Sequence, residues 1–162
     1  MTAVLESGAH VELNGLVIEG QVWIDASPTR VFEALTTPAW LAAWWGDEQI
    51  YTSSNWQIAA EPGSAWRCDI HTRNGAAHGL SGEVLEALPD QLLSLSWQAS
   101  WLAPPPTEVR FELEPADGGT LLVLRHQGFR PDFSGRDTHQ AGWPWVLRWL
   151  ARQFPLDTEN RS

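Results

Sequence analysis

The sequence contains a single cysteine, Cys68, and no lysine at all. One cysteine excludes an internal disulfide. Without lysine, all positive side-chain charge comes from ten arginines, against 20 acidic residues, and the formal net charge is −10. Proteins that bind nucleic acid usually carry a basic patch or stripe, and the arginines form no cluster. The sequence therefore predicts neither a nucleic-acid partner nor binding to an anionic membrane surface.

Long apolar runs and processing signals are also missing. No stretch approaches the roughly 20 apolar residues that a membrane-spanning helix needs. The first eight residues include Glu6, no basic residue and no apolar segment of the kind that signal peptides contain. We therefore expect a cytoplasmic protein.

Motifs for catalysis and metal binding are absent as well. The five histidines form no H-x-H or H-E-x-x-H pair, and Cys68 has no C-x-x-C partner, so we expect no metal site and no cofactor. There is no G-x-S-x-G, G-x-G-x-x-G or P-loop. A lone cysteine is usually a small buried apolar residue rather than a nucleophile. The sequence predicts no catalytic residue and favours a binding protein over an enzyme.

Tryptophan, by contrast, is abundant, with eleven in 162 residues. Each indole ring can bury roughly 150–250 Å² and carries an N–H group that needs a partner. One interpretation is that most of these rings fill the core. The other is that several line a ligand cavity, where a rigid apolar wall with a polar edge is useful.

The first part of the chain reads as strand, then two short helices. Residues 16–25 alternate apolar and polar, which is typical of a half-buried strand. Asn14-Gly15 before them is a hairpin signal, so the N-terminal extension over 1–15 is a candidate for a short strand. Ser27-Pro28 and Thr37-Pro38 are both helix start signals.

The rest of the chain predicts a sheet covered by a helix. Apolar–polar alternation and turn signals recur at regular spacing from 56 to 129, which favours an antiparallel meander. A continuous apolar stripe at helical spacing follows, formed by Trp143, Leu147, Leu150 and Phe154. Pro144 either starts this helix or kinks it. We therefore expect an α+β fold with a six- or seven-stranded antiparallel sheet, in a single domain over 16–154 followed by a tail over 155–162.

Several segments together resemble a known family. Residues 22–46 read VWIDASPTRVFEALTTPAWLAAWWG, which is similar to the opening of the family named after the activator of the heat-shock chaperone ATPase. The similarity continues in PGSAWRCDIHT (62–72), GEVLEALPDQLLSLSW (82–97) and GGTLLVLRHQGF (118–129), and in Gly142-Trp143 followed by VLRWL. That family belongs to the START-like, or SRPBCC, superfamily, which includes lipid-transfer domains, polyketide cyclases and the major birch pollen allergen.

The resemblance implies a helix-grip fold, in which the sheet wraps around the long C-terminal helix. It also implies a cavity between them that binds or carries a small hydrophobic or amphipathic molecule, with a link to stress. Two alternatives remain: a cyclase- or hydrolase-type enzyme that uses the same cavity, and a chaperone-linked protein-interaction module. Nothing in the chain resembles the separate N-terminal chaperone-binding domain of the eukaryotic activators, which weakens the last alternative.

The predicted ligand site consists of residues whose spacing turns them toward the space between sheet and helix. They are Trp44, Trp66, Trp97, Phe111, Leu124, His126, Trp143 and Leu147. His126 shares a strand face with Leu122 and Leu124. It is either a buried histidine with a local partner or a polar anchor for the ligand.

Two further tryptophans fall on the opposite side of the predicted C-terminal helix. Trp145 and Trp149 lie beside Arg148 and Arg152, and exposed aromatic patches with arginine neighbours often mark interfaces. We expect a homodimer or partner contact there. The alternative is that the preceding segment, 130–140, folds over both rings.

Overall fold

The computed structural model describes residues 9–102, 105–129 and 135–154. In this part of the chain, eight strands and three helices follow one another as β1 (His10–Asn14), β2 (Val17–Ile24), α2 (Pro28–Thr36), α3 (Pro38–Trp44), β3 (Tyr51–Gln57), β4 (Ala65–Thr72), β5 (Ala77–Leu88), β6 (Leu92–Ala99), β7 (Thr107–Ala116), β8 (Gly119–Gln127) and α4 (Gly135–Ala151). The α+β class and the helix-grip arrangement predicted from the sequence are confirmed.

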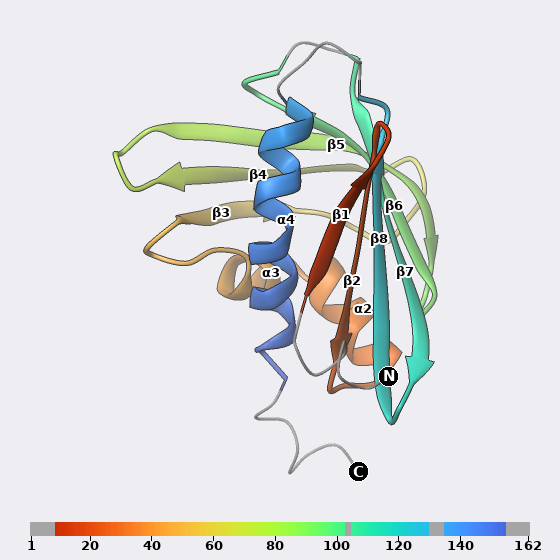
Figure 1. Ribbon diagram of the computed structural model, residues 1–162. Helices are drawn as coiled ribbons and strands as arrows, with labels where there is room; N and C mark the ends of the chain where they lie inside the picture. The colour runs from red at the N-terminus through yellow and green to blue at the C-terminus, as the bar shows by residue number, and fades with distance from the viewer. Residues whose placement is uncertain (1–8, 103–104, 130–134, 155–162) are drawn as a thin grey trace.

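All eight strands form one antiparallel sheet in the order β1-β2-β8-β7-β6-β5-β4-β3. The strand count exceeds the predicted six or seven, and the hairpin at Asn14-Gly15 does form, with β1 paired to β2. Figure 1 shows that the sheet is strongly curled, because β3, β4 and β5 cross α4 whereas β1, β2 and β8 run alongside it. The register of β5 against β6 shifts between Val84 and Glu86, and such bulges let a strand bend.

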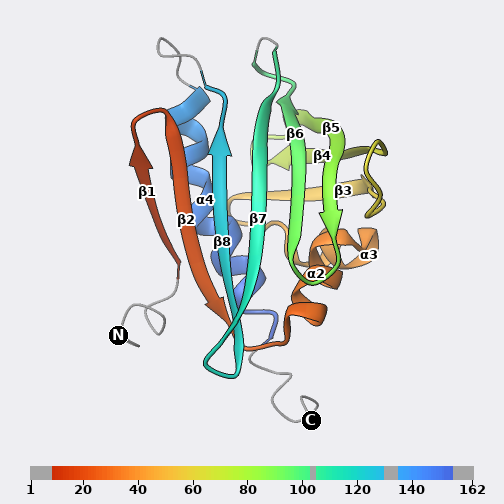
Figure 2. The same ribbon diagram turned by 90° about the vertical axis from the view of Figure 1, so that its right-hand side faces the viewer.

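The two short helices begin where the sequence predicts. The side chain of Ser27 accepts a hydrogen bond from the backbone N–H of Arg30 at 3.2 Å, and Pro28 occupies the first turn of α2. Pro38 likewise begins α3. These caps place α2 and α3 beside one end of the sheet, as the view in Figure 2 shows.

The last helix begins earlier than the sequence suggests. It extends from Gly135, so that Pro144 lies inside it rather than at its start. The predicted stripe of Trp143, Leu147 and Leu150 is buried, and the helix packs against β2 and β1.

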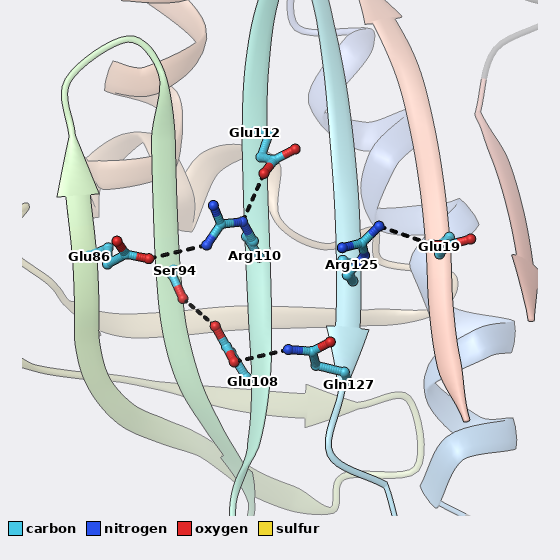
Figure 3. A network of polar contacts seen from close by, with 8 residues as sticks. All are labelled: Glu19, Glu86, Ser94, Glu108, Arg110, Glu112, Arg125 and Gln127. Atoms are coloured by element: carbon cyan, nitrogen blue, oxygen red, sulfur yellow. Dashed lines mark hydrogen bonds and ion pairs between the residues drawn. The ribbon is translucent and has the colours of Figure 1, made fainter. Parts of the chain in front are cut away.

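The outer face of the sheet is polar and carries several ion pairs. Arg110 bridges Glu86 at 3.1 Å and Glu112 at 2.8 Å, and Arg125 pairs with Glu19 at 3.2 Å. Figure 3 shows these groups spread across β5, β7, β8 and β2. The arginines of this face thus lie among carboxylates instead of forming a basic patch. The apolar side chains occupy the inner face, and the candidate site lies there.

Candidate functional site

A cavity of about 370 Å³ lies between α4 and the strands β3 to β6. Its lining comes from β3, β4, β5, β6, α4 and the residues just after α3 and β6, and consists of Trp45, Tyr51, Ile70, Thr72, His78, Leu80, Trp97, Trp101, His139, Gly142, Trp143 and Val146. Aromatic rings dominate this set, and it contains no aspartate, glutamate or arginine. The volume falls within the range of about 300–1,000 Å³ that is usual for small-molecule sites.

Three tryptophan rings pack against one another to form the inner wall. The ring centroids of Trp45 and Trp97 lie 6.1 Å apart, those of Trp97 and Trp143 5.4 Å, and those of Trp45 and Trp143 6.0 Å. Trp44, Trp56 and Trp66 pack behind them, each in ring contact with a neighbour. Offset and edge-to-face pairs of this kind are attractive beyond the area that they bury. The wall is therefore rigid.

Each indole N–H of this wall already has a partner inside the protein. Trp45 donates to the hydroxyl of Tyr51 at 3.1 Å, Trp97 to Nε2 of His139 at 3.1 Å, and Trp143 to Nδ1 of His126 at 3.0 Å. An indole nitrogen has only one proton to donate. These three tryptophans thus offer a ligand their apolar surfaces and no hydrogen bond.

His126 is held in one neutral form by its neighbours. Because Trp143 donates to Nδ1, the ring proton sits on Nε2, which contacts the hydroxyl of Thr107 at 2.7 Å. That hydroxyl in turn donates to the carbonyl oxygen of Trp97 at 3.2 Å. Burial, and then the nearby His139, lower the pKa of His126 well below its usual value. Both ring nitrogens are thus engaged, and His126 orients Trp143.

The cavity opens beside Trp101, whose side chain is 42% exposed. This ring lies between two histidines that also line the cavity: His78 meets it edge to face at 5.3 Å, and His139 stacks on it at 6.2 Å. His78 and Thr72 are half-buried at the same end. The mouth therefore differs from the interior in carrying polar groups.

The eight residues predicted for the site are all buried. Trp97 and Trp143 line the cavity. The other six, Trp44, Trp66, Phe111, Leu124, His126 and Leu147, belong to the core around it. Trp44 turns toward α2, where its N–H donates to the carbonyl oxygen of Ala34 at 2.9 Å.

Trp45 lines the cavity, whereas the predicted Trp44 does not. The helix α3 ends at Trp44, and Trp45 has an extended backbone with φ −86° and ψ 91°. Its side chain therefore leaves the helical pattern and reaches the cavity. Trp66 lies one layer behind, and its N–H passes over Gly82 to the carbonyl oxygen of Ser96 at 2.8 Å. Any Cβ at Gly82 would lie 1.9 Å from that oxygen, so this contact requires glycine.

Sequence reasoning missed Tyr51, Thr72, His78, Trp101 and His139. Tyr51 is the first residue of β3, whereas the apolar–polar alternation indicates strands only from residue 56. His139 lies in the first half of α4, a region that was predicted to be a loop. The signal that could have found Tyr51 is its uniqueness as the only tyrosine of the chain.

The predicted aromatic patch on the far side of α4 does not exist. Trp145 is 43% exposed and has the guanidinium of Arg148 over its ring, but Trp149 is only 1% exposed. The ring of Tyr51 meets Trp149 edge to face at 5.3 Å, because the curled sheet brings β3 to this side of the helix. The prediction that both rings face outward was wrong for Trp149. The sequence alternative was that segment 130–140 folds over both rings. Residues 130–134 of this segment lie outside the described residues.

Two further properties of the described residues bear on the class of site. No helix among them has the length and apolar character to cross a membrane. Within the same ranges, no three histidine, cysteine, aspartate or glutamate side chains come together as metal ligands would. Burial raises the pKa of the Cys68 thiol to about 12, so this cysteine is a protonated core residue and not a nucleophile.

Comparison with known proteins agrees with this geometry. The model of the family described as "Activator of Hsp90 ATPase homolog 1-like protein" matches residues 25–154. A solved structure from Rhodobacter sphaeroides is similar with a TM-score of 0.80 at 22% identity, covering 92% of this chain and 99% of that one. The AHSA1 protein from Silicibacter pomeroyi gives 0.74 at 23% identity, covering 87% and 99%.

A putative protein in the dynemicin biosynthetic locus gives a TM-score of 0.69 at 21% identity, covering 92% of this chain and 51% of that one. At such identities, the three structures show a shared fold alone. No curated protein matches the sequence.

Proposed function

The chain belongs to the Activator of Hsp90 ATPase homolog 1-like protein family, and from its fold and cavity we propose that it binds or carries a small, flat, uncharged apolar molecule. The observation that carries this proposal is the cavity itself: about 370 Å³ under α4, walled by Trp45, Trp97 and Trp143. Rigid aromatic walls suit a flat ligand, because ring contacts add to the gain from burying apolar surface.

The absence of charge in the lining argues for an uncharged ligand. The lining residues include no arginine, aspartate or glutamate, so a charged group on the ligand would be taken out of water without a counter-ion. Such a transfer costs several kcal/mol or more. The tryptophan N–H groups are engaged within the protein and cannot compensate for it.

Gly142 provides a way to close the cavity without disturbing the wall. It lies on α4 and lines the cavity, and an added Cβ there meets no atom within 4 Å. A Gly142→Phe variant should fill the space with its ring. A Gly142→Ala variant is the matched control, because it places a side chain at the same position but leaves most of the cavity free. Alanine should also stabilise the helix by about 0.5–1 kcal/mol.

The test uses indane, a flat neutral bicyclic hydrocarbon, and isothermal titration calorimetry. The wild type and Gly142→Ala should bind it with similar affinity, whereas Gly142→Phe should bind at least about tenfold more weakly, a difference of roughly 1.4 kcal/mol. Indane-1-carboxylate should bind the wild type more weakly than indane does. Equal binding to Gly142→Phe, or no binding to the wild type, would show that this cavity is not the site.

The finer expectations from the sequence stay predictions. They are the cytoplasmic location, the link to stress, a chaperone partner and a cyclase- or hydrolase-type reaction in the same cavity. The catalytic alternative depends on two imidazole rings of the lining, His78 at the cavity mouth and the buried His139. Turnover of a bound molecule that is lost in a His139→Gln variant would support it over simple binding.

A further inference from the structure

The polar groups of the cavity are few, and most already have partners. The tryptophan N–H groups of the wall are engaged, and Nε2 of His139 accepts from Trp97. The hydroxyl of Thr72 contacts the side chain of Asn74 and the carbonyl oxygen of Ala76. His78 and Trp101 lie at the exposed mouth. Of the two hydroxyl groups of the lining, that of Thr72 already donates, whereas that of Tyr51 only accepts a hydrogen bond within the described residues.

The geometry of Tyr51 fixes what its hydroxyl can do. Trp45 donates to the Tyr51 oxygen at 3.1 Å, and because an indole nitrogen is a donor only, the oxygen must be the acceptor in this bond. The hydroxyl proton is then left to donate elsewhere, and within the described residues it forms no hydrogen bond. A polar proton in an apolar site gains strongly from a partner, because leaving it unpaired costs free energy.

The phenol ring is also held in place before any ligand arrives. Trp149 packs edge to face against it at 5.3 Å, and the bond from Trp45 holds its oxygen. Burial raises the pKa of Tyr51 far above its usual value, so the hydroxyl remains a neutral donor. A donor that is already oriented loses little entropy on binding.

We infer that Tyr51 is the polar anchor of the cavity, and that it donates a hydrogen bond to a neutral acceptor oxygen, of the ketone class, on a flat apolar ligand. The inference rests on the proposed function, since it concerns the same cavity, and it adds the chemical feature that the ligand carries. A carboxylate is disfavoured because no cationic side chain lines the site. The structural alternative is that Tyr51 serves only as acceptor for Trp45.

A matched pair of probes separates these roles. 1-Indanone and indane have nearly the same shape, but only the first has a carbonyl oxygen. Their affinities are measured by calorimetry for the wild type, for Tyr51→Phe and for Thr72→Val, which removes the other hydroxyl of the lining. In Tyr51→Phe, 1-indanone should bind at least about fivefold more weakly while the affinity for indane changes by less than about twofold, as expected for the loss of one hydrogen bond. Thr72→Val should not weaken the binding of 1-indanone more than that of indane.

The outcomes distinguish the two proposals. If the wild type binds neither probe, the proposed function fails, and the anchor fails with it. If the wild type binds indane but binds the more polar 1-indanone more weakly, the cavity is a ligand site and Tyr51 is not its donor. This comparison uses the wild type alone, so it holds even if Tyr51→Phe does not fold. An equal loss of both probes in Tyr51→Phe would assign Tyr51 a structural role. A loss of 1-indanone binding in Thr72→Val would place the anchor at Thr72.

Discussion

At the scale of single residues, the site depends on the internal partners of its aromatic rings. Trp143 is oriented by His126, Trp97 by His139 and Trp45 by Tyr51. In each pair, the partner accepts the hydrogen bond from the indole N–H. The apolar surface of the ring then faces the cavity. His126 can act in this way only while it is neutral, because a protonated ring has no lone pair to accept with. The cavity wall is therefore sensitive to acid.

This dependence predicts how stability changes with pH. Burial, and to a lesser degree His139, place the pKa of folded His126 well below 6.5, whereas the unfolded chain has the ordinary value near 6.5. Below that pH the unfolded state binds a proton that the folded state does not. The free energy of unfolding should therefore be fully retained above about pH 6.5 and should fall by up to about 1.4 kcal/mol per pH unit as the pH drops below it.

Urea unfolding between about pH 7 and pH 5 measures this slope. His126→Gln should be less stable overall, since the bond from Trp143 is disturbed, but its stability should depend less on pH. His10→Gln is the control, because His10 is exposed, and it should keep the wild-type slope. The account of His126 is wrong if both variants show the same dependence as the wild type.

At the scale of elements, α4 is gripped on more than one side. Its inner stripe packs on β2 and β1. On another side of the helix, Tyr51 of β3 packs against the ring of Trp149. Trp145, one turn earlier, stays 43% exposed. The two tryptophans therefore have different roles, although the sequence places them on the same side of the helix.

Substituting each of these tryptophans in turn should show this difference. Trp149→Ala removes a buried ring and should lower the free energy of unfolding by about 3–5 kcal/mol. Trp145→Ala should change it by less than about 1 kcal/mol, since it removes a ring that is 43% exposed, with its contacts to Arg148 and to the ring of Trp149. Urea unfolding compares the two, and equal losses would contradict the buried position of Trp149. The homodimer stays a prediction that now rests on Trp145, and sedimentation of the wild type against Trp145→Ser tests it.

Local signals in the sequence were sufficient for most of the elements. Asn14-Gly15 marked the first hairpin, and Ser27 with Pro28 marked the start of α2; the structure confirms both. The start of α4 was not predictable in this way, because Pro144 usually indicates a helix start and here lies within the helix. That error hid His139, which was assigned to a loop.

The lining of the site could be predicted only in part, because alternation shows which face of a strand a residue occupies but not where that face meets the helix. Phe111, Leu124 and Leu147 are inward and buried as predicted, yet they belong to β7, β8 and the face of α4 that packs on β2, and none of them lines the cavity. The curl of the sheet decides which inward residues reach the same space. Tyr51 and Trp45 lie there because β3 and the end of α3 bend toward it, and no spacing rule encodes that bend.

At the scale of the whole molecule, the fold separates two surfaces. The outer face of the sheet carries several ion pairs (Figure 3), whereas the inner face and α4 enclose an aromatic cavity without charge. The tryptophan residues are distributed accordingly: some fill the core behind the wall, and Trp45, Trp97, Trp101 and Trp143 meet the cavity. One group of rings thus fills the core as predicted, and that the other group lines a ligand cavity stays a prediction.

The same tryptophans provide the most direct measurement of the central claim, that a flat neutral molecule enters this cavity. Each indole N–H gives its own signal in a ¹H–¹⁵N correlation spectrum, and the ring current of a bound aromatic molecule shifts signals close to it. On titration with indane, the signals of Trp45, Trp97, Trp101 and Trp143 should shift together and saturate, while those of Trp23 and Trp40, which do not line the cavity, should stay in place. Shifts confined to Trp40 and Trp145, or none at all, would contradict the account.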